Sequence, residues 1–332
     1  MYIPFTIYDL RFTNYELRIT IFSLIICVIC EICGSFNSTF NISIMNSVYH
    51  GGIIPLQTMS ESEFRRFSEF IHTFCGIKMP PAKRTMLEGR LRKRLRVLGM
   101  QSFKGYCDYL FSPEGQNNEM VHMIDVVTTN KTDFFREPGC FNYLTDTAAQ
   151  ELAGLHGAGV RKKLMIWSAG CSSGEEPYTL AMLFKEYAER HSGFHFSVFA
   201  TDICTKMLEF AQHAIYPEER TTPVPPELKM KYFMTSRDRT DKRVRIVPEL
   251  RSLVRFQRLN FMEKEYRLKD NMDIIFCRNV MIYFDKATQE MLIHRFCRHL
   301  SPGGYLVIGH SEILTGMDVP LVRASQTVYK AV

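Results

Sequence analysis

Between residues 163 and 309 the sequence alternates short apolar runs with longer polar segments, and this alternation limits the possible folds more than any other feature. A helical segment, Glu175–Arg190, separates the first two runs. Strands separated by helices of this length predict an α/β domain whose parallel sheet carries helices on both faces. The runs that have the length and composition of buried strands are 163–168, 196–201, 253–259, 272–277 and 305–309.

A segment of about residues 215–248 interrupts the alternation between the second and third predicted strands. It holds two short extended runs, Tyr232–Met234 and Val244–Val247, on either side of the charged residues 236–242. Two extended runs around a charged turn predict a small β-subdomain inserted into the α/β domain.

Residues 59–135 show a helical period and no strand pattern, which predicts a small helical bundle ahead of the α/β domain. The first helix is expected to begin at Ser60, where Ser60 and Glu63 form a capping box, and to end at Gly76. The second follows Pro81, carries leucines along one face and ends at Gly99. Two further helices are expected over residues 103–110 and 119–127.

The second of these helices is strongly basic. Residues 83–96 contain seven Lys or Arg against a single acid, Glu88, in a chain whose net charge is +6. Lys83, Arg90 and Arg94 fall along one side of the helix, far in sequence from the loops described below, and we expect them to dock an acidic helix or phosphates. The alternative is a merely solvated face. No aromatic residues interleave with the cations, so nucleic acid is not the expected partner.

Residues 1–58 do not resemble the rest of the chain. Their apolar run, Ile21–Cys30, is shorter than the roughly 20 residues that span a bilayer, so no stable membrane insertion is expected. The C-x-x-C-x-x-C run of Cys27, Cys30 and Cys33 is interpreted as chance, and no metal site is predicted, because no second Cys or His cluster follows closely. Met59 opens a natural N-terminus. A misplaced start codon is therefore the favoured interpretation, ahead of a disordered extension and a membrane anchor.

Polar residues follow three of the predicted strands, at the sheet edge where ligands bind in such folds. The loop Ser168–Pro177 is rich in glycine and serine but lacks the Gly-Lys-Ser/Thr of a phosphate-binding loop, and its two acids would repel a pyrophosphate. Asp202 ends the second strand, and Arg278 and Asn279 leave the fourth. This set predicts a site for an adenosine that carries a positive group, and S-adenosylmethionine fits that description.

Four motifs, in this order, resemble those of the CheR chemotaxis receptor methyltransferases: Thr129–Glu137, Ala169–Tyr178, Cys277–Phe284 and Gly309–Glu312. The resemblance runs from about Met59 to the C-terminus and leaves residues 1–58 unmatched. It implies a Rossmann-like S-adenosylmethionine-dependent methyltransferase domain over 136–332, an N-terminal helical domain over 59–135 and the inserted β-subdomain. A cytoplasmic location is expected, because a secreted fate would separate the protein from its cytosolic cofactor.

The resemblance also implies roles for individual residues. Arg136 and Tyr283 would be catalytic residues bordering the point of methyl transfer. In some members the β-subdomain grips a C-terminal receptor peptide, but Thr235–Arg239 lacks the glycine pair of those members, so that function stays open. The residues that would line the cofactor site are Asn130, Thr132, Arg136, Glu176, Asp202, Asn260, Phe261, Arg278 and Asn279.

The function implied is transfer of a methyl group from S-adenosylmethionine to glutamate carboxylates in the acidic helical segments of methyl-accepting chemotaxis receptors. The products would be glutamate methyl esters and S-adenosylhomocysteine. Two alternatives remain. A methyltransferase acting on nucleic acid is disfavoured because the Asn/Asp-Pro-Pro-Tyr motif is absent. A non-catalytic cofactor-binding adaptor is disfavoured because Arg136, Asn279 and Tyr283 are all present.

Overall fold

The computed structural model describes residues 58–236, 238 and 240–332, which belong to one compact unit. The predictions made for the first 57 residues, including the apolar run, the cysteine run and the misplaced start, lie outside the described residues. Within the described ranges, no helix is both long enough and apolar enough to cross a membrane.

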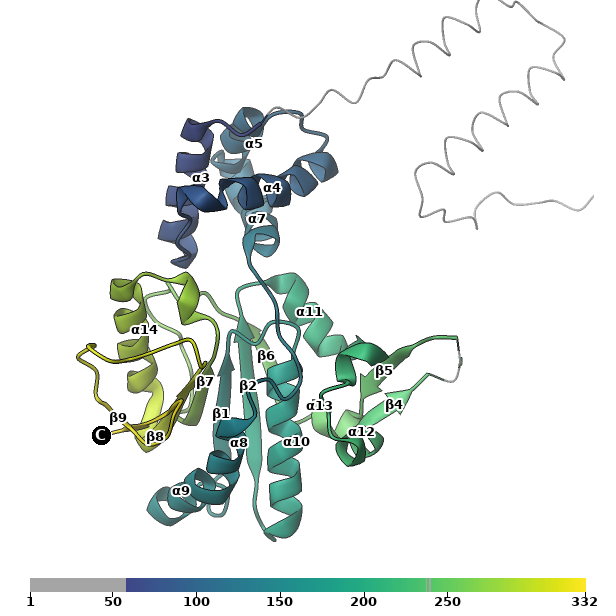
Figure 1. Cartoon of the computed structure of the whole chain (residues 1–332), viewed down its shortest axis with the longest axis vertical. Coiled ribbons are helices and arrows are strands. Elements are labelled where there is room, and N and C mark those ends of the chain that lie inside the picture. The colour runs from purple at the N-terminus through teal and green to yellow at the C-terminus, as the bar shows by residue number, and fades with distance from the viewer. Residues whose placement is uncertain (1–57, 237, 239) are drawn as a thin grey trace, which may run out of the picture. The chain divides into compact units, whose positions relative to one another are not determined.

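A helical bundle precedes the sheet, as predicted (Figure 1). The capping box is present, since the Ser60 side chain accepts from the Glu63 amide while the Glu63 carboxylate accepts from the Ser60 amide at 2.7 Å. Gly76 and Gly99 end the first two helices with φ of 74° and 67°, in the left-handed region where glycine is favoured. The helices are α3 (Glu61–Cys75), α4 (Arg84–Leu98), α5 (Phe103–Leu110), α6 (Pro113–Asn118) and α7 (Met120–Val127).

Arg94 of α4 faces the bundle and not the solvent. Its side chain is 13% exposed, and its guanidinium donates to both carboxylate oxygens of Glu119 at 2.5 and 2.6 Å. Tyr106 donates to the same carboxylate at 2.9 Å, and Glu119 is buried. The prediction that Arg94 is a free docking cation is therefore wrong, because its charge compensates a buried acid that lies 25 residues away in sequence.

The α/β domain is built on a seven-stranded sheet in the order β6-β2-β1-β7-β8-β10-β9. The first five strands in this order are parallel, as predicted, whereas β10 runs antiparallel to both β8 and β9. The alternation did not reveal the short strands β10 and β9, which complete the sheet beyond β8. The bounds are β1 (Leu164–Ala169), β2 (Phe196–Asp202), β6 (Val254–Arg258), β7 (Met272–Cys277), β8 (Leu300–Ile308), β9 (Leu321–Arg323) and β10 (Val328–Ala331).

The sheet separates two hydrophobic cores. Ile166 of β1 packs into one core and the next residue, Trp167, into the other, as the two-residue period of a strand requires. The first core also receives α9 (Ala149–His156), α10 (Glu175–Arg190) and α11 (Thr205–His213), together with α8 (Gly139–Tyr143). The second core receives α14 (Lys286–His299). Helices therefore cover both faces, which confirms the predicted α/β class.

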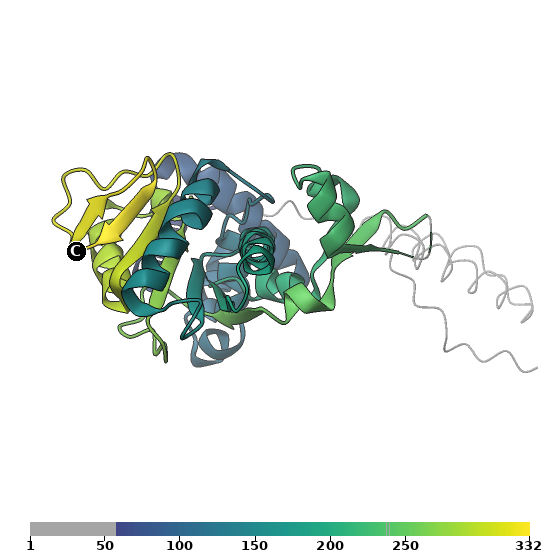
Figure 2. The same cartoon turned by 90° about the horizontal axis from the view of Figure 1, so that it is seen from below.

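The inserted β-subdomain is also present. Its antiparallel sheet has the order β3-β5-β4 and adds a strand that the sequence did not reveal, β3 (Ile215–Pro217), to β4 (Phe233–Thr235) and β5 (Arg243–Ile246). The short helices α12 (Pro226–Tyr232) and α13 (Pro248–Arg251) accompany it. Figures 1 and 2 show it on the side of the α/β domain away from the C-terminal strands.

The ion pair of Arg94 generates a stability prediction. Arg94→Ala should lower the free energy of unfolding by about 3–5 kcal/mol, because it leaves the carboxylate of Glu119 buried without its cation. Urea denaturation followed by circular dichroism measures the change. Lys93→Ala, which removes an exposed cation of the same helix, should change stability by no more than about 0.5 kcal/mol. Equal effects of the two substitutions would contradict the assignment.

Candidate active site

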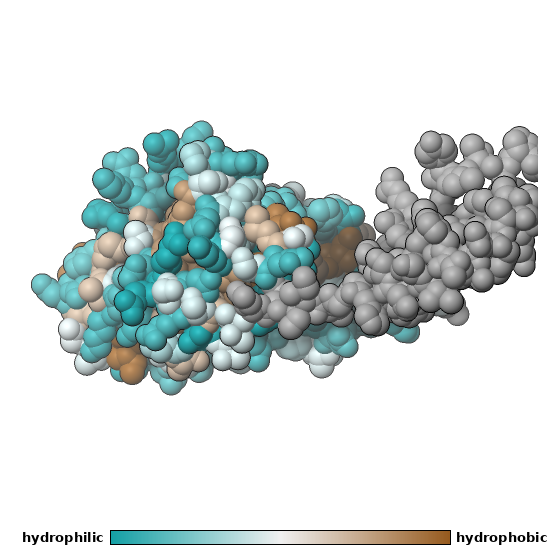
Figure 3. All heavy atoms as spheres, turned by 90° about the horizontal axis from the view of Figure 1, so that it is seen from above, coloured by the Kyte–Doolittle hydropathy of each residue, from teal (hydrophilic) through white to brown (hydrophobic). Residues whose placement is uncertain are grey.

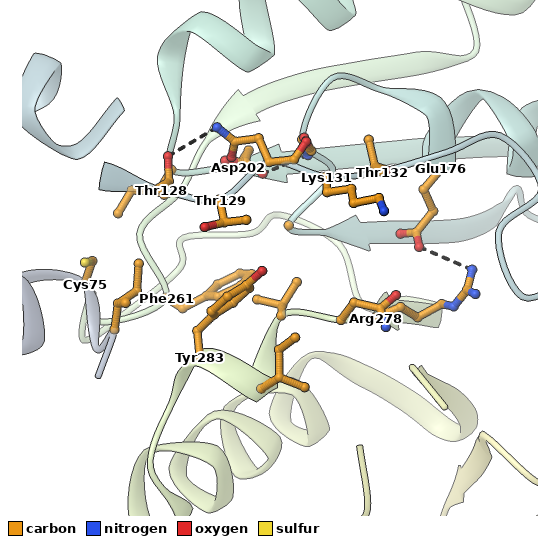
Figure 4. Close-up of a pocket in the computed structure, with 18 of the residues that line it drawn as sticks. Cys75, Thr128, Thr129, Lys131, Thr132, Glu176, Asp202, Phe261, Arg278 and Tyr283 are labelled. Atoms are coloured by element: carbon orange, nitrogen blue, oxygen red, sulfur yellow. Dashed lines mark hydrogen bonds and ion pairs between the residues drawn. The ribbon is translucent and has the colours of Figure 1, made fainter. Parts of the chain in front are cut away.

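A cavity of about 260 Å³ lies at the carboxyl ends of the parallel strands. Its walls come from the loops after β1, β2, β6 and β7, from the segment that joins the bundle to the α/β domain, and from α3 and α4 (Figure 4). Every predicted cofactor residue lines the cavity, namely Asn130, Thr132, Arg136, Glu176, Asp202, Asn260, Phe261, Arg278 and Asn279. The predicted residues Tyr283, Lys83 and Arg90 line it too. Arg94 alone among the predicted site residues does not.

The glycine loop after β1 is held in a strained shape. Gly170 has φ of 87°, and a Cβ there would lie 2.6 Å from Cγ2 of Val280. Ser172 adopts a left-handed φ of 49°, which is unfavourable for a serine. Two bonds hold it, because its amide donates to Asp202 at 2.8 Å and its hydroxyl donates to the Asn130 carbonyl at 2.9 Å. Such conformations persist only where the surroundings impose them, and they gather at binding sites.

Asp202 serves both the local backbone and the cavity. Its two oxygens accept from the amides of Ser172 and Cys204, each at 2.8 Å. Burial raises its pKa above the ordinary carboxyl value. A carboxylate has about four acceptor positions, so the oxygens retain capacity for ligand hydroxyl or amino donors.

Arg278 ties three segments of the wall together. Its side chain is 2% exposed, and its guanidinium lies 3.6 Å from the Glu176 carboxylate and 3.2 Å from that of Glu137. It also donates to the Arg136 carbonyl at 2.6 Å. Its Nε is buried without a partner among the described residues. Arg278 lines the cavity as expected, but most of its donors serve the protein.

Two glutamates that sequence reasoning left without a role hold the loop after β7. Glu312 accepts from the amides of Gly309, Asn279, Val280 and Met281 at 2.6–3.0 Å. Glu137 accepts from the Asn279 side chain at 3.2 Å and from the His310 amide at 3.1 Å. Both residues stand inside the motifs quoted above, so the motifs identified them, but no periodicity or charge signal indicated what they bind.

Asn260 joins the bundle to the α/β domain beside the cavity. Its side-chain amide donates to the Phe74 carbonyl of α3 at 2.6 Å, and its oxygen accepts from the Met262 amide at 3.0 Å. Its neighbour Phe261 contributes a largely buried ring to the same wall (Figure 4). These two residues therefore shape the cavity as well as line it.

Cations and a tyrosine also line the cavity. Lys83 Nζ lies 5.7 Å from the ring centre of Tyr283. Arg90 donates to the Val127 carbonyl and, at 2.8 Å, to the Thr129 hydroxyl, and burial lowers its pKa. Arg90, which is far in sequence from the cofactor motifs, thus lies beside the ligand-binding loops in space. Arg136 is 32% exposed and donates to the Lys131 carbonyl at 3.2 Å.

These features fit an adenosine ligand with a positive group. Buried acids and aromatic rings line the cavity, and no lysine stands in the glycine loop to bind phosphates. The open acceptor positions of Asp202 would accept hydrogen bonds from such a ligand. Over residues 58–236, 238 and 240–332, no cluster of three or more His, Cys, Asp or Glu side chains is arranged to hold a metal ion.

The fold and the site together define an S-adenosylmethionine-dependent methyltransferase. A family model described as the SAM binding domain of CheR methyltransferase matches residues 130–329. A second, described as the all-alpha domain of CheR methyltransferase, matches residues 62–128. The chain therefore belongs to the CheR methyltransferase family, which confirms the resemblance, and its cofactor is S-adenosylmethionine.

Curated relatives agree with this assignment. A chemotaxis protein methyltransferase of Borreliella burgdorferi is 38% identical over 259 residues, which cover 78% of this chain and 90% of the relative. One of Escherichia coli K12 is 38% identical over 271 residues, which cover 82% and 91%. Among solved structures, the glycopeptide N-methyltransferase MtfA with S-adenosylmethionine has a TM-score of 0.28 at 15% identity, covering 55% of this chain and 58% of that one.

Asp202 supplies the first prediction for the site. Asp202→Ala should weaken binding of S-adenosylhomocysteine by about 1–3 kcal/mol, because it removes an acceptor for buried ligand donors and loosens the loop at Ser172. Isothermal titration calorimetry measures the affinity. Asp146→Ala, which removes an exposed carboxylate away from the cavity, is the control and should leave the affinity unchanged. An unaltered affinity in the Asp202 variant would remove this residue from the site.

The buried acids also predict a pH dependence. Burial raises the pKa of Asp202 and of Glu176, so both carboxyls begin to protonate at a higher pH than the ordinary value of about 4. Ligand hydroxyl and amino donors favour the ionised form. Affinity for S-adenosylhomocysteine should therefore be greatest above these raised pKa values and fall as the pH falls through them. Calorimetry from neutral pH downward tests this, and an affinity that rises on acidification would contradict it.

Proposed function

We propose that this chain transfers the methyl group of S-adenosylmethionine to glutamate carboxylates of methyl-accepting chemotaxis receptors, forming glutamate methyl esters. The observation that carries the proposal is the set of three cations, Lys83, Arg90 and Arg136, that line the cavity together with Tyr283. It lies in the same cavity as the acids that suit the cofactor, so an anionic substrate group would meet the cofactor there. The names of the curated relatives support the link to chemotaxis.

The reaction requires the enzyme to position the carboxylate and the methyl group, and it does not require a general base. A glutamate carboxylate is already ionised near pH 7, so no proton has to be removed before it attacks. S-adenosylmethionine supplies a methyl group activated by a positively charged sulfur. Arg136 would hold an anionic carboxylate in the cavity and Tyr283 would donate a hydrogen bond beside it, which fixes the line of attack. Displacement of water from the cavity by the bound substrate and cofactor would strengthen both interactions.

We assign receptor docking to the bundle side of the cavity, where Lys83 and Arg90 line it. Acidic helical methylation segments are complementary to the cations of α4, and the end of the molecule formed by the bundle is largely hydrophilic (Figure 3). Lys83 and Arg90 keep the proposed docking role, with Arg90 placed at the cavity itself, whereas Arg94 is withdrawn from it. Because S-adenosylmethionine is a cytosolic cofactor, we place the chain in the cytoplasm.

A transfer assay tests the proposal. Receptor-containing membranes incubated with the chain and methyl-labelled S-adenosylmethionine should acquire label that mild base releases as methanol, which marks a carboxyl ester. Arg136→Ala should lower turnover by about a hundredfold even at saturating receptor, since a misplacement of about 1 Å between reacting groups can cost this much.

The control is Arg96→Ala, which removes an exposed cation at the end of α4 that does not line the cavity and should leave turnover unchanged. Label that resists base, or label found in nucleic acid, would contradict the proposed substrate. Full turnover by the Arg136 variant would remove that residue from the catalytic role.

A further inference from the structure

The β-subdomain touches the glycine loop of the cofactor site directly. Tyr216 of β3 is fully buried, and its hydroxyl donates to the Ser173 carbonyl at 2.8 Å. The approach is so close that a Cβ at Gly174 would lie 2.9 Å from the same hydroxyl oxygen. Gly174 has φ of 95°, so this position combines a left-handed backbone with the absence of space for a side chain. The shape of the loop therefore depends on a residue of the inserted subdomain.

A second contact carries charge. Arg220, which lies in the 3-10 turn Glu218–Thr221 after β3, forms an ion pair with Glu175 and donates to the Ser173 hydroxyl at 3.2 Å. The Glu175 side chain is 0% exposed and accepts from the Ser173 hydroxyl at 2.6 Å. A carboxylate buried to this degree needs a cation beside it. Glu175 is the first residue of α10, immediately after the loop, and Arg220 comes from the subdomain.

The subdomain also packs against a second segment beside the cavity. The ring of Phe134 packs edge-on against Tyr216 at 5.0 Å and against Phe233 of β4 at 5.5 Å between ring centres. Phe134 itself does not line the cavity, but its neighbours 130–133, 135 and 136 do. Arg220 and Phe134 thus connect one subdomain to the two segments that hold the cofactor side of the site.

We propose that Arg220 and Tyr216 are positioning residues for the cofactor loop, so that the β-subdomain and the cofactor cavity are energetically coupled. The loop contains the strained Ser172, and such a conformation needs an external hold. Coupling between two sites is reciprocal, so cofactor binding must stabilise the β-subdomain as much as the subdomain strengthens binding. Arg220 is 33% exposed, so a partner seated on the subdomain has access to it. The inference rests on cofactor binding and not on the receptor substrate.

The test measures binding and backbone protection, not turnover. Arg220→Gln in the full chain should weaken binding of S-adenosylhomocysteine by about tenfold in calorimetry, which corresponds to about 1.4 kcal/mol. In the wild type, S-adenosylhomocysteine should slow hydrogen exchange of the β3 and β5 amides. The variant should lose this ligand-dependent protection. A matched control is Arg243→Gln, whose side chain is 63% exposed and pairs with Asp241 on the subdomain surface; it should retain both properties.

A paired variant separates positioning from simple neutralisation of Glu175. Glu175→Gln combined with Arg220→Gln removes both charges and leaves no uncompensated buried acid, so it also covers the case in which Arg220→Gln fails to fold. Binding that stays weakened in the double variant supports the positioning role, and Tyr216→Phe should weaken binding in the same direction. Wild-type affinity in the double variant, or ligand-dependent protection that persists in Arg220→Gln, would overturn the proposal.

Discussion

A buried arginine at the carboxyl end of β7 is the interaction on which the site depends. Arg278 is 2% exposed, and a guanidinium taken out of water is tolerated only when anions and carbonyls surround it. Glu176 at the start of α10 and Glu137 in the joining segment supply the charges, and the Arg136 carbonyl supplies a further acceptor. Satisfying one charge therefore fixes a helix, a loop and a strand end against one another, and the cavity forms where they meet.

The two halves of the described chain divide the work at this cavity. The α/β domain contributes buried carboxylates and a loop whose left-handed backbone requires glycine. The bundle contributes Lys83, which lies beside Tyr283, and Arg90. Direct bonds keep the halves together: Asn260 donates to the Phe74 carbonyl, and the Lys78 amide donates to the Tyr283 carbonyl at 2.8 Å. Tyr283, which we assign to methyl transfer, is thus held in place partly by the helical domain. The bundle therefore also supports the active site.

The sequence predicted the architecture because most of its helices and strands are determined by local patterns of apolar and polar residues. The alternation of apolar runs with helices identified every parallel strand, and the Ser60 and Glu63 box marked the start of α3. The short strands β3, β9 and β10 were not predicted because strands of three or four residues carry little hydrophobic signal. The burial of Arg94 was not predicted from the sequence for another reason. A charge on a basic helix looks exposed until its partner, Glu119, is placed by the fold.

The active site, too, was predicted only in part. The motifs named residues that do gather around one cavity, but they did not tell ligand contacts from scaffold contacts. Arg278, Asn279 and Asn260 carry out much of their bonding within the protein, and Glu312 binds four backbone amides that only the folded loop brings together. The coupling of Arg220 to Glu175 links positions 45 residues apart through the inserted subdomain, which no local pattern reveals.

A crystal structure of the full chain with S-adenosylhomocysteine tests the central claim most directly. The account predicts that the ligand occupies the cavity, with its adenosine donors in contact with the carboxylates of Asp202 or Glu176 and its sulfur on the side of Tyr283 and Arg136. A ligand bound elsewhere, or one whose sulfur faces away from Tyr283 while Asp202 makes no contact with it, would contradict the account.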